Sequence, residues 1–339
     1  MPFSLPAPIP IRSTVPLPIR RRRAVGRSAF VAAALTVSAT AFAADKPDPA
    51  NYNGFDVSNA SVPVRAIQRG GPPRDGIPAI DRPRFVAAAD AALADGDRVL
   101  GLERGGVVRA YPIRILNWHE VVNDRIGDEP VVVTYCPLCG TGMTFLAPAT
   151  TGAGRFGVSG LLYNSDVLLY DRATQSLWSQ ILKTAVSGPL RGARLQALPM
   201  THTSWADWRR RHPATQVLST DTGFERDYAR DPYAGYGQVQ RLMFEVEHRD
   251  ERFPLKEWVL GVEAGGEVKA YPFSVLATAV DGRGELRDVV GGQRLRIRFD
   301  REHQTAEAFD EQGRAWPATQ AYWFAWVAFH PKTEVLRGR

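Results

Sequence analysis

The chain has 339 residues, of which 44% are hydrophobic, and its 42 Lys and Arg outnumber its 36 Asp and Glu. The whole excess lies in the first 44 residues, which contain six Arg and neither Asp nor Glu, so the rest of the chain carries 36 residues of each sign. Without a net positive charge, that remainder has no general basic field, which argues against a protein that binds nucleic acid or anionic membrane surfaces.

Residues 1–43 predict a cleavable secretory signal. The arginines come first, an Ala- and Val-rich run follows over 29–43, and the run ends in the small-x-small sequence Ala41-Phe42-Ala43. This run is shorter than the roughly 20 apolar residues that span a bilayer. We therefore expect a periplasmic or secreted protein with no integral membrane span after signal removal. The consecutive arginines also permit twin-arginine export, but we favour the general secretory route.

Residues 44–94 predict an extended, proline-rich lead-in that ends in a short helix. The helix is expected from Pro83 to about Ala94, because proline is tolerated in a first helical turn and Asp81 is available as a cap.

An internal repeat is the most informative feature of the rest of the chain. The sequence VLGLERGGVVRAYP (99–112) returns without a gap, 160 residues later, as VLGVEAGGEVKAYP (259–272). Each copy predicts a β-hairpin with a Gly-Gly turn, followed by a helix (112–122 or 272–278) and a strand (131–135 or 295–299). The repeat indicates an internal duplication. We expect a β-rich α+β fold with short helices and two related β units, about 97–147 and 257–312.

Further elements are expected between and after the two copies. Residues 156–170 are rich in β-formers, and 168–178 predict a hairpin around a polar turn. A short helix is expected over 204–211 because Pro213 follows it. The aromatic stretch 321–329 predicts a buried helix or strand that closes the core.

The two copies differ in the residues that can carry chemistry. The first contains Trp118-His119-Glu120 and Cys136-Pro137-Leu138-Cys139, where the second has Thr278-Ala279-Val280 and Asp300-Arg301-Glu302-His303. Features shared by both copies serve the fold, so these unshared residues place the candidate site in the first copy.

Three interpretations of the Cys136–Cys139 pair remain open. A Cys-x-x-Cys-Gly turn can hold a metal ion, with His119 as a third ligand and Glu120 as a further ligand or partner; two thiolates and an imidazole suit copper or zinc better than iron. The pair can instead be a redox dithiol of an oxidoreductase or sensor, although Gly140 and Gly142 make a poor start for the helix that a thioredoxin motif needs. Finally, the pair can form a structural disulfide in a non-catalytic binding module, where so small a ring stabilises by only about 2 kcal/mol.

Other cofactors and reaction types are not supported by the sequence. Gly140, rather than histidine, follows Cys139, which argues against covalently attached c-type haem. The sequence has neither a dinucleotide fingerprint nor a phosphate loop, so we expect no nucleotide cofactor. Asp166 and Asp171 are too isolated in the sequence to indicate acid–base catalysis. The sequence identifies no partner.

Long motifs resemble the bacterial and archaeal DUF3179 family, a domain of unknown function, over about residues 95–335. They are NWHEVVND, VVVTYCPLCGTGMTF and FGVSGLLYNSDVLLYDRATQSLWSQ. The resemblance implies an exported protein whose hallmark is the CPLC segment beside the WHE segment, and it implies no particular reaction. Because the likeness is dense there, Leu161–Asp166 and Ser176–Gln180 are expected to line the site.

Overall fold

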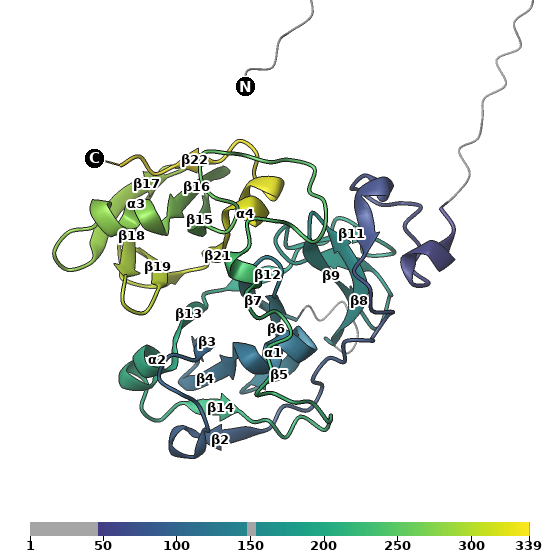
Figure 1. Cartoon of the computed structure of the whole chain (residues 1–339), viewed down its shortest axis with the longest axis horizontal. Coiled ribbons are helices and arrows are strands. Elements are labelled where there is room, and N and C mark those ends of the chain that lie inside the picture. The colour runs from purple at the N-terminus through teal and green to yellow at the C-terminus, as the bar shows by residue number, and fades with distance from the viewer. Residues whose placement is uncertain (1–46, 148–153, 339) are drawn as a thin grey trace, which may run out of the picture. The chain divides into compact units, whose positions relative to one another are not determined.

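The computed structural model describes residues 47–147 and 154–338, which form a β-rich fold (Figure 1). These residues contain five small sheets and four short α-helices, so the expected β-rich class with short helices is confirmed. Within these ranges, no helix is long and apolar enough to cross a membrane. The predicted signal, residues 1–43, lies outside the described residues.

The first copy of the repeat begins with a hairpin inside a five-stranded sheet. Its strand order is β13 (Thr201–Ser204), β3 (Arg98–Arg104), β4 (Val107–Pro112), β14 (Gln216–Leu218) and β2 (Phe85–Ala87). The β3–β4 turn has positive φ at Gly105 and Gly106, 57° and 77°, a conformation that glycine adopts without steric cost. The predicted hairpin is therefore confirmed.

The second copy builds a four-stranded sheet whose strand order matches the first four strands of that sheet, and it has no counterpart of β2 among the described residues. It runs β21 (Thr319–Tyr322), β15 (Trp258–Ala264), β16 (Glu267–Pro272) and β22 (Glu334–Val335). In both sheets the hairpin has an antiparallel neighbour on one side and a parallel neighbour on the other. A helix follows the antiparallel neighbour each time, α2 (Trp205–Arg211) or α4 (Trp323–Phe329). The similarity of the two copies thus extends beyond the stretch visible in the sequence.

A tryptophan from each of these helices packs on a glycine of the hairpin. A Cβ atom added to Gly101 would lie 2.3 Å from the Trp208 ring, and one added to Gly261 would lie 2.2 Å from the Trp326 ring. The two indole N–H groups donate to the hydroxyls of Thr215 and Thr333, each at 3.0 Å. Glycine is required at both positions because the ring occupies the space of a side chain.

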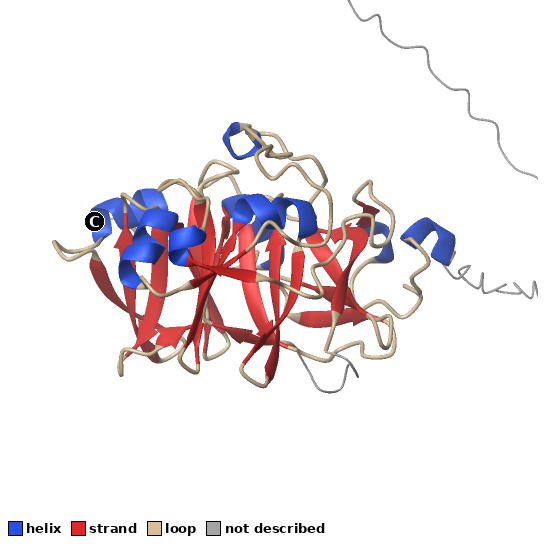
Figure 2. Ribbon diagram, turned by 90° about the horizontal axis from the view of Figure 1, so that it is seen from below, coloured by secondary structure: helices blue, strands red, loops and turns tan. Residues whose placement is uncertain are grey.

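Two further sheets carry the turns that differ between the copies. One has the order β12 (Gln196–Leu198), β7 (Thr141–Leu146), β6 (Glu129–Cys136) and β5 (Val121–Ile126). The other has the order β17 (Glu285–Val290), β18 (Gln293–Asp300), β19 (Thr305–Asp310) and β20 (Ala315–Trp316). As predicted, helices precede them, α1 (Ile113–His119) and α3 (Phe273–Ala279). The CPLC segment forms the β6–β7 turn. Figure 2 shows the helices grouped beside one end of the strands.

The remaining sheet lies in the sequence between the two copies. Its order is β1 (Ile67–Arg69), β8 (Phe156–Tyr163), β9 (Asp166–Asp171), β10 (Leu177–Ser179) and β11 (Thr184–Ser187). Every residue of β8 and β9 is buried. Asn164 and Ser165 join the two strands with φ of 52° and 63°, as in a tight type I′ hairpin turn. This turn fixes the position of Asp166, the first residue of β9.

The helix predicted over 83–94 is not formed. Residues Phe85–Ala87 are strand β2, and Ala88–Asp90 are a single 3-10 turn. Strand β2 pairs antiparallel with β14, with Ala87 opposite Gln216. A free sheet edge, supplied by residues far along the chain, therefore outweighs the local helix preference of this alanine-rich stretch.

Residues 219–257 connect the two halves without forming a strand, and they cover the β8–β9 turn. Their regular structure is limited to the 3-10 helix Tyr236–Gln238. The Ser165 hydroxyl donates to the carbonyl of Phe244 at 2.9 Å, and the backbone N–H of Glu247 donates to Asn164 at 2.8 Å. Irregular segments of this length are uncommon in compact domains and are frequently functional.

Candidate metal centre

Both cysteines are buried thiols at the β6–β7 turn. Cys136 ends β6, Cys139 lies in the turn, and their exposed fractions are 1% and 0%. Gly140 follows with φ of 64°, and a Cβ there would lie 2.6 Å from the Trp258 ring. The glycine thus lets the chain turn under a tryptophan while it holds both sulfurs inside the core.

Asp166 is brought to the two cysteines by the β8–β9 turn. One ligand atom from each of Cys136, Cys139 and Asp166 lies within 4.8 Å of the other two. Asp166 is fully buried, and its Oδ2 accepts a hydrogen bond from the Ile181 N–H at 3.0 Å. Its Oδ1 has no partner of good hydrogen-bond geometry among the described residues, although both cysteine thiols lie close enough to lower the pKa of the carboxyl group. Metal bonds of about 2.3 Å to sulfur and 2.1 Å to oxygen put the ligands of one zinc ion roughly 3.5–4 Å apart. The three side chains therefore need only small movements to share an ion.

The carbonyl oxygen of Ser165 lies beside both sulfurs. It is 3.6 Å from Cys136 Sγ and 3.4 Å from Cys139 Sγ, so each thiol can donate a weak hydrogen bond to it. If the thiols lose their protons, these bonds are lost and the carbonyl becomes available as a fourth, oxygen ligand.

Burial raises the pKa of each acidic group of this centre. It raises the pKa of the Cys136 thiol and raises that of Cys139 well above its ordinary value. Burial also raises the pKa of Asp166 to about 7 and, together with the nearby Asp166 charge, that of Glu120 to about 8. Neutral thiols are poor nucleophiles, and a metal ion that binds here must displace their protons.

A buried lysine lies in the aromatic cluster beside the cysteine turn, where the backbone N–H of Tyr322 donates to the carbonyl of Cys139 at 2.9 Å. Lys256 is 6% exposed, and its Nζ has no hydrogen-bond partner in the described part of the chain. The ammonium lies 3.1 Å from the centre of the Tyr236 ring, with the rings of Tyr322 and Phe324 at 5.3 and 5.2 Å. Burial lowers the pKa of Lys256 to about 8, and the neighbouring Cys139 opposes that shift.

His119, the expected third ligand, lies elsewhere. Its Nδ1 is 2.7 Å from the carbonyl oxygen of Pro78, and its Nε2 is 2.6 Å from the hydroxyl of Tyr228. Both ring nitrogens are therefore occupied, and the group of ligand atoms within 4.8 Å contains Asp166 in place of His119. Glu120, which follows with φ of 56°, interacts electrostatically with Cys136. Within the WHE segment, Glu120 is thus the residue whose charge affects the pKa of Cys136.

The segments Leu161–Asp166 and Ser176–Gln180 both reach the centre. The first supplies Ser165 and Asp166. From the second, the Gln180 amide donates to the Thr134 hydroxyl at 2.7 Å and to the Thr141 carbonyl at 3.2 Å, in the two strands that flank the cysteines. Asp166 was expected among the residues that line the site but not as a ligand. It ends the FGVSGLLYNSD motif, and that motif is the signal that could have identified its role.

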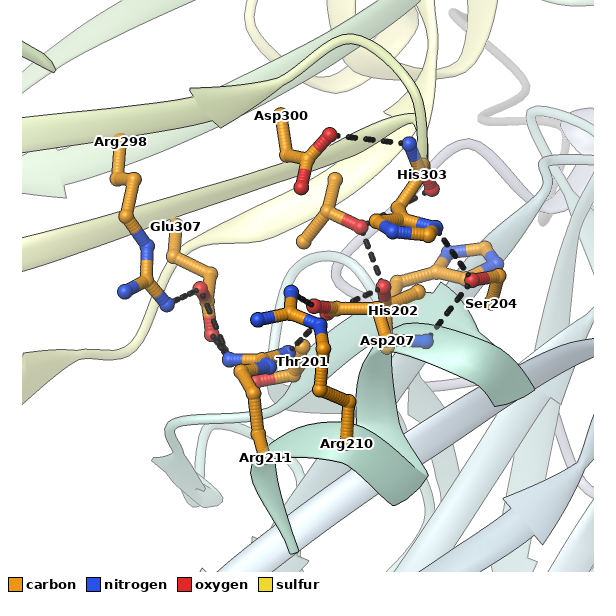
Figure 3. A network of polar contacts seen from close by, with 12 residues as sticks. Thr201, His202, Ser204, Asp207, Arg210, Arg211, Arg298, Asp300, His303 and Glu307 are labelled. Atoms are coloured by element: carbon orange, nitrogen blue, oxygen red, sulfur yellow. Dashed lines mark hydrogen bonds and ion pairs between the residues drawn. The ribbon is translucent and has the colours of Figure 1, made fainter. Parts of the chain in front are cut away.

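A second group of candidate ligands lies between α2 and the β18–β19 turn and consists of Asp207, Asp300 and His303 (Figure 3). There the Asp207 carboxylate already pairs with Arg210 at 2.6 Å and Arg211 at 2.8 Å. Arg211 also pairs with Glu307 at 3.3 Å. Two guanidinium groups on one carboxylate repel a cation, so this network joins the β18–β19 hairpin to α2 and is not a metal centre.

The structure also contains a cavity of about 550 Å³. Trp208, His212, Glu307 and Gln320 are among its lining residues, and neither cysteine is. We place the candidate site at the cysteines because their buried donor set has the chemistry of a ligand shell, whereas a cavity alone does not specify a reaction.

The substitution Glu120→Gln should flatten the pH dependence of stability of the metal-free protein. An unfolded chain ionises Glu120 near its ordinary pKa of 4.5, whereas the folded chain holds its proton up to about pH 8. Its stabilising contribution is complete below the ordinary pKa and is lost as the pH rises through the folded value. We expect the free energy of unfolding, measured in urea from about pH 5 to pH 8, to fall less in the variant than in the parent.

Glu307→Gln is the control with the opposite sign. Burial raises the pKa of Glu307, but the neighbouring Arg211 and Arg298 outweigh burial and bring this pKa below its ordinary value. The stabilising contribution of Glu307 is therefore lost at low pH instead. An unchanged slope in Glu120→Gln would show that the buried glutamate does not control the pH dependence.

Comparison with known proteins agrees with the motifs. The profile of the family described as "Protein of unknown function (DUF3179)" matches residues 74–333. No curated protein and no protein of solved structure matches the chain significantly.

Proposed function

The chain belongs to the DUF3179 family, and from that premise and the geometry of the cysteine turn we propose that it is an exported metal-binding protein. Its ligands are the thiolates of Cys136 and Cys139 and the carboxylate of Asp166. Two sulfur ligands favour zinc or copper, and less so iron.

The observation that carries this proposal is the grouping of three buried donor atoms within 4.8 Å. The carboxylate comes from the β8–β9 hairpin, whose apolar side chains pack in the same core as the cysteines, so Asp166 is a charged group placed within that core. Burial raises the pKa of Asp166 to about 7, because a charged carboxylate in the core costs free energy, and a bound cation offsets that cost. Three protein ligands also leave one coordination position for the Ser165 carbonyl, a water or a substrate.

A thiol–disulfide oxidoreductase or redox sensor is the second candidate, and two observations weigh against it. Exposed fractions of 1% and 0% leave no path for a partner's disulfide. Burial also raises the pKa of both thiols, whereas reactive cysteines have a lowered pKa and partial exposure. Redox chemistry of a bound copper or iron ion is compatible with the same ligands. A non-catalytic module with a structural disulfide is the third candidate.

Export and duplication belong to the same proposal. The arginine-rich and apolar segments in residues 1–43 support secretion to the periplasm or beyond, where free cysteines readily oxidise unless a metal protects them. The shared strand order of the two hairpin sheets and the matched Gly–Trp contacts support an origin by duplication. On this interpretation the second copy provides structure, and the first provides the metal centre.

The deciding experiment is elemental analysis, with a free-thiol count, of protein isolated from its own compartment. We expect about one equivalent of a transition metal and thiols that resist alkylation until a chelator is added. Metal-free protein with both thiols free, or with a disulfide, would overturn the metal proposal. The potential of such a disulfide would then separate a redox catalyst from a structural link.

A further inference from the structure

The metal centre has an unusual charge environment because its ionisable groups are almost all buried. Besides Asp166, Glu120 and Lys256 are the groups whose charges affect the pKa of the cysteine thiols. Burial and the cysteines in turn raise the pKa of four neighbouring tyrosines, Tyr135, Tyr233, Tyr236 and Tyr322, above the ordinary value. Burial raises the pKa of Glu120 to about 8 and so favours its neutral form. Lys256 is therefore the one cation that these interactions bring to the centre.

The ammonium of Lys256 has neither an ion pair nor a hydrogen bond among the described residues, and its contacts are with aromatic rings. Its Nζ is buried without a hydrogen-bond partner and lies against the faces of Tyr236, Tyr322 and Phe324. Cation–π contacts of this kind recover only about 2 kcal/mol, less than the several kcal/mol that burial of an ammonium costs. A buried anion nearby would offset the rest, and deprotonated Cys139 is such an anion.

We propose that Lys256 is the buried counter-ion of the loaded metal centre and that this charge set matches a divalent ion, of which Zn²⁺ is the example. The inference rests on the proposed metal site. Two thiolates and one carboxylate carry three negative charges, and Lys256 supplies one positive charge. A divalent ion then makes the buried cluster neutral, whereas Cu⁺ leaves one negative charge without compensation in the protein interior.

A counter-ion role for Lys256 affects the two metal affinities differently, which a role in packing alone does not. The three ligands carry a net charge of one negative with Zn²⁺ and two negative with Cu⁺, so the ammonium attracts the Cu⁺-loaded ligand set more strongly. Removal of the ammonium must therefore weaken Cu⁺ binding more than Zn²⁺ binding. A purely structural lysine would change both affinities by the same factor or change neither.

The test is metal competition on the folded chain and on Lys256→Met, which keeps the length and apolar stem of the side chain. Zn²⁺ affinity is measured against a zinc chelator and Cu⁺ affinity against a cuprous chelator. We expect Zn²⁺ affinity to fall by about 10–100-fold, as for other residues that support metal ligands, and Cu⁺ affinity to fall by a larger factor. The preference for Zn²⁺ over Cu⁺ should thus increase.

Two further variants make the result decisive. Lys256→Arg keeps the charge and should retain the parental preference, even if its larger head lowers stability. Lys269→Met removes another buried lysine, one that pairs with Asp288 at 3.0 Å and Glu334 at 2.9 Å, and should leave both affinities unchanged. Equal losses for the two ions in Lys256→Met, or a larger loss for Zn²⁺, would overturn the counter-ion role. Failure of the parent protein to bind either ion would instead overturn the metal site itself.

Discussion

Replacement of both Cys136 and Cys139 with serine should abolish stoichiometric metal binding and leave the fold intact. Two of the three protein ligands are lost, and structural zinc sites with cysteine ligands owe about 10–16 kcal/mol of binding free energy to their complete ligand set. Serine is slightly smaller than cysteine, so it fits positions that are 1% and 0% exposed. Elemental analysis gives the metal content, and Co²⁺ titration reports the thiolate-to-metal absorption that the variant should lack.

Single substitutions identify the third ligand. Asp166→Asn keeps the shape of the side chain but removes its charge. We expect metal affinity to fall by about 10–100-fold or more, since residues that only support a metal ligand already contribute that factor. His119→Gln should leave metal affinity unchanged, because both ring nitrogens already have partners in Pro78 and Tyr228. The reverse pattern would make His119 the ligand, and full metal content in the double cysteine variant would remove the site altogether.

The substitution Trp326→Ala should destabilise the protein by about 3–5 kcal/mol, the usual cost of deleting a buried aromatic side chain. Trp326 is fully buried, lies on Gly261, and stacks on His330 with ring centres 4.0 Å apart. Its removal opens a cavity between α4 and the hairpin sheet and leaves the Thr333 hydroxyl without the indole donor. Urea unfolding measures the change in the free energy of unfolding.

Trp316→Ala is the matched control for that substitution. Trp316 is only partly buried and lies on the edge strand β20, so its loss should cost less than that of Trp326. Metal affinity should be the same in both variants, because neither tryptophan lies at the β6–β7 turn. Equal destabilisation by the two substitutions would show that the Gly–Trp contact does not support the second sheet.

Local sequence patterns were sufficient for most elements of this fold. The Gly-Gly turns specify the two hairpins because glycine adopts a positive φ without cost. The helix at 204–211 was predicted from local signals and occurs as Trp205–Arg211. The predicted helix over 83–94 was wrong, because Phe85–Ala87 pairs with the edge of strand β14. The local sequence does not indicate this distant partner. The equivalence of α2 and α4 also escaped the sequence comparison, since the β8–β11 insertion separates α2 from its own hairpin.

The sequence by itself determined that Cys136 and Cys139 lie together, since the two cysteines are three residues apart in a glycine-ended turn. It also placed the pair in the first copy, because the second lacks it. Only the tertiary structure decided what surrounds the pair. Asp166 and Lys256 reach the cysteines from segments 27 and 117 residues beyond Cys139, and His119 turns toward Tyr228 instead. Burial by these distant segments sets the charges of the centre, and a local pattern carries no information on which segments will provide it.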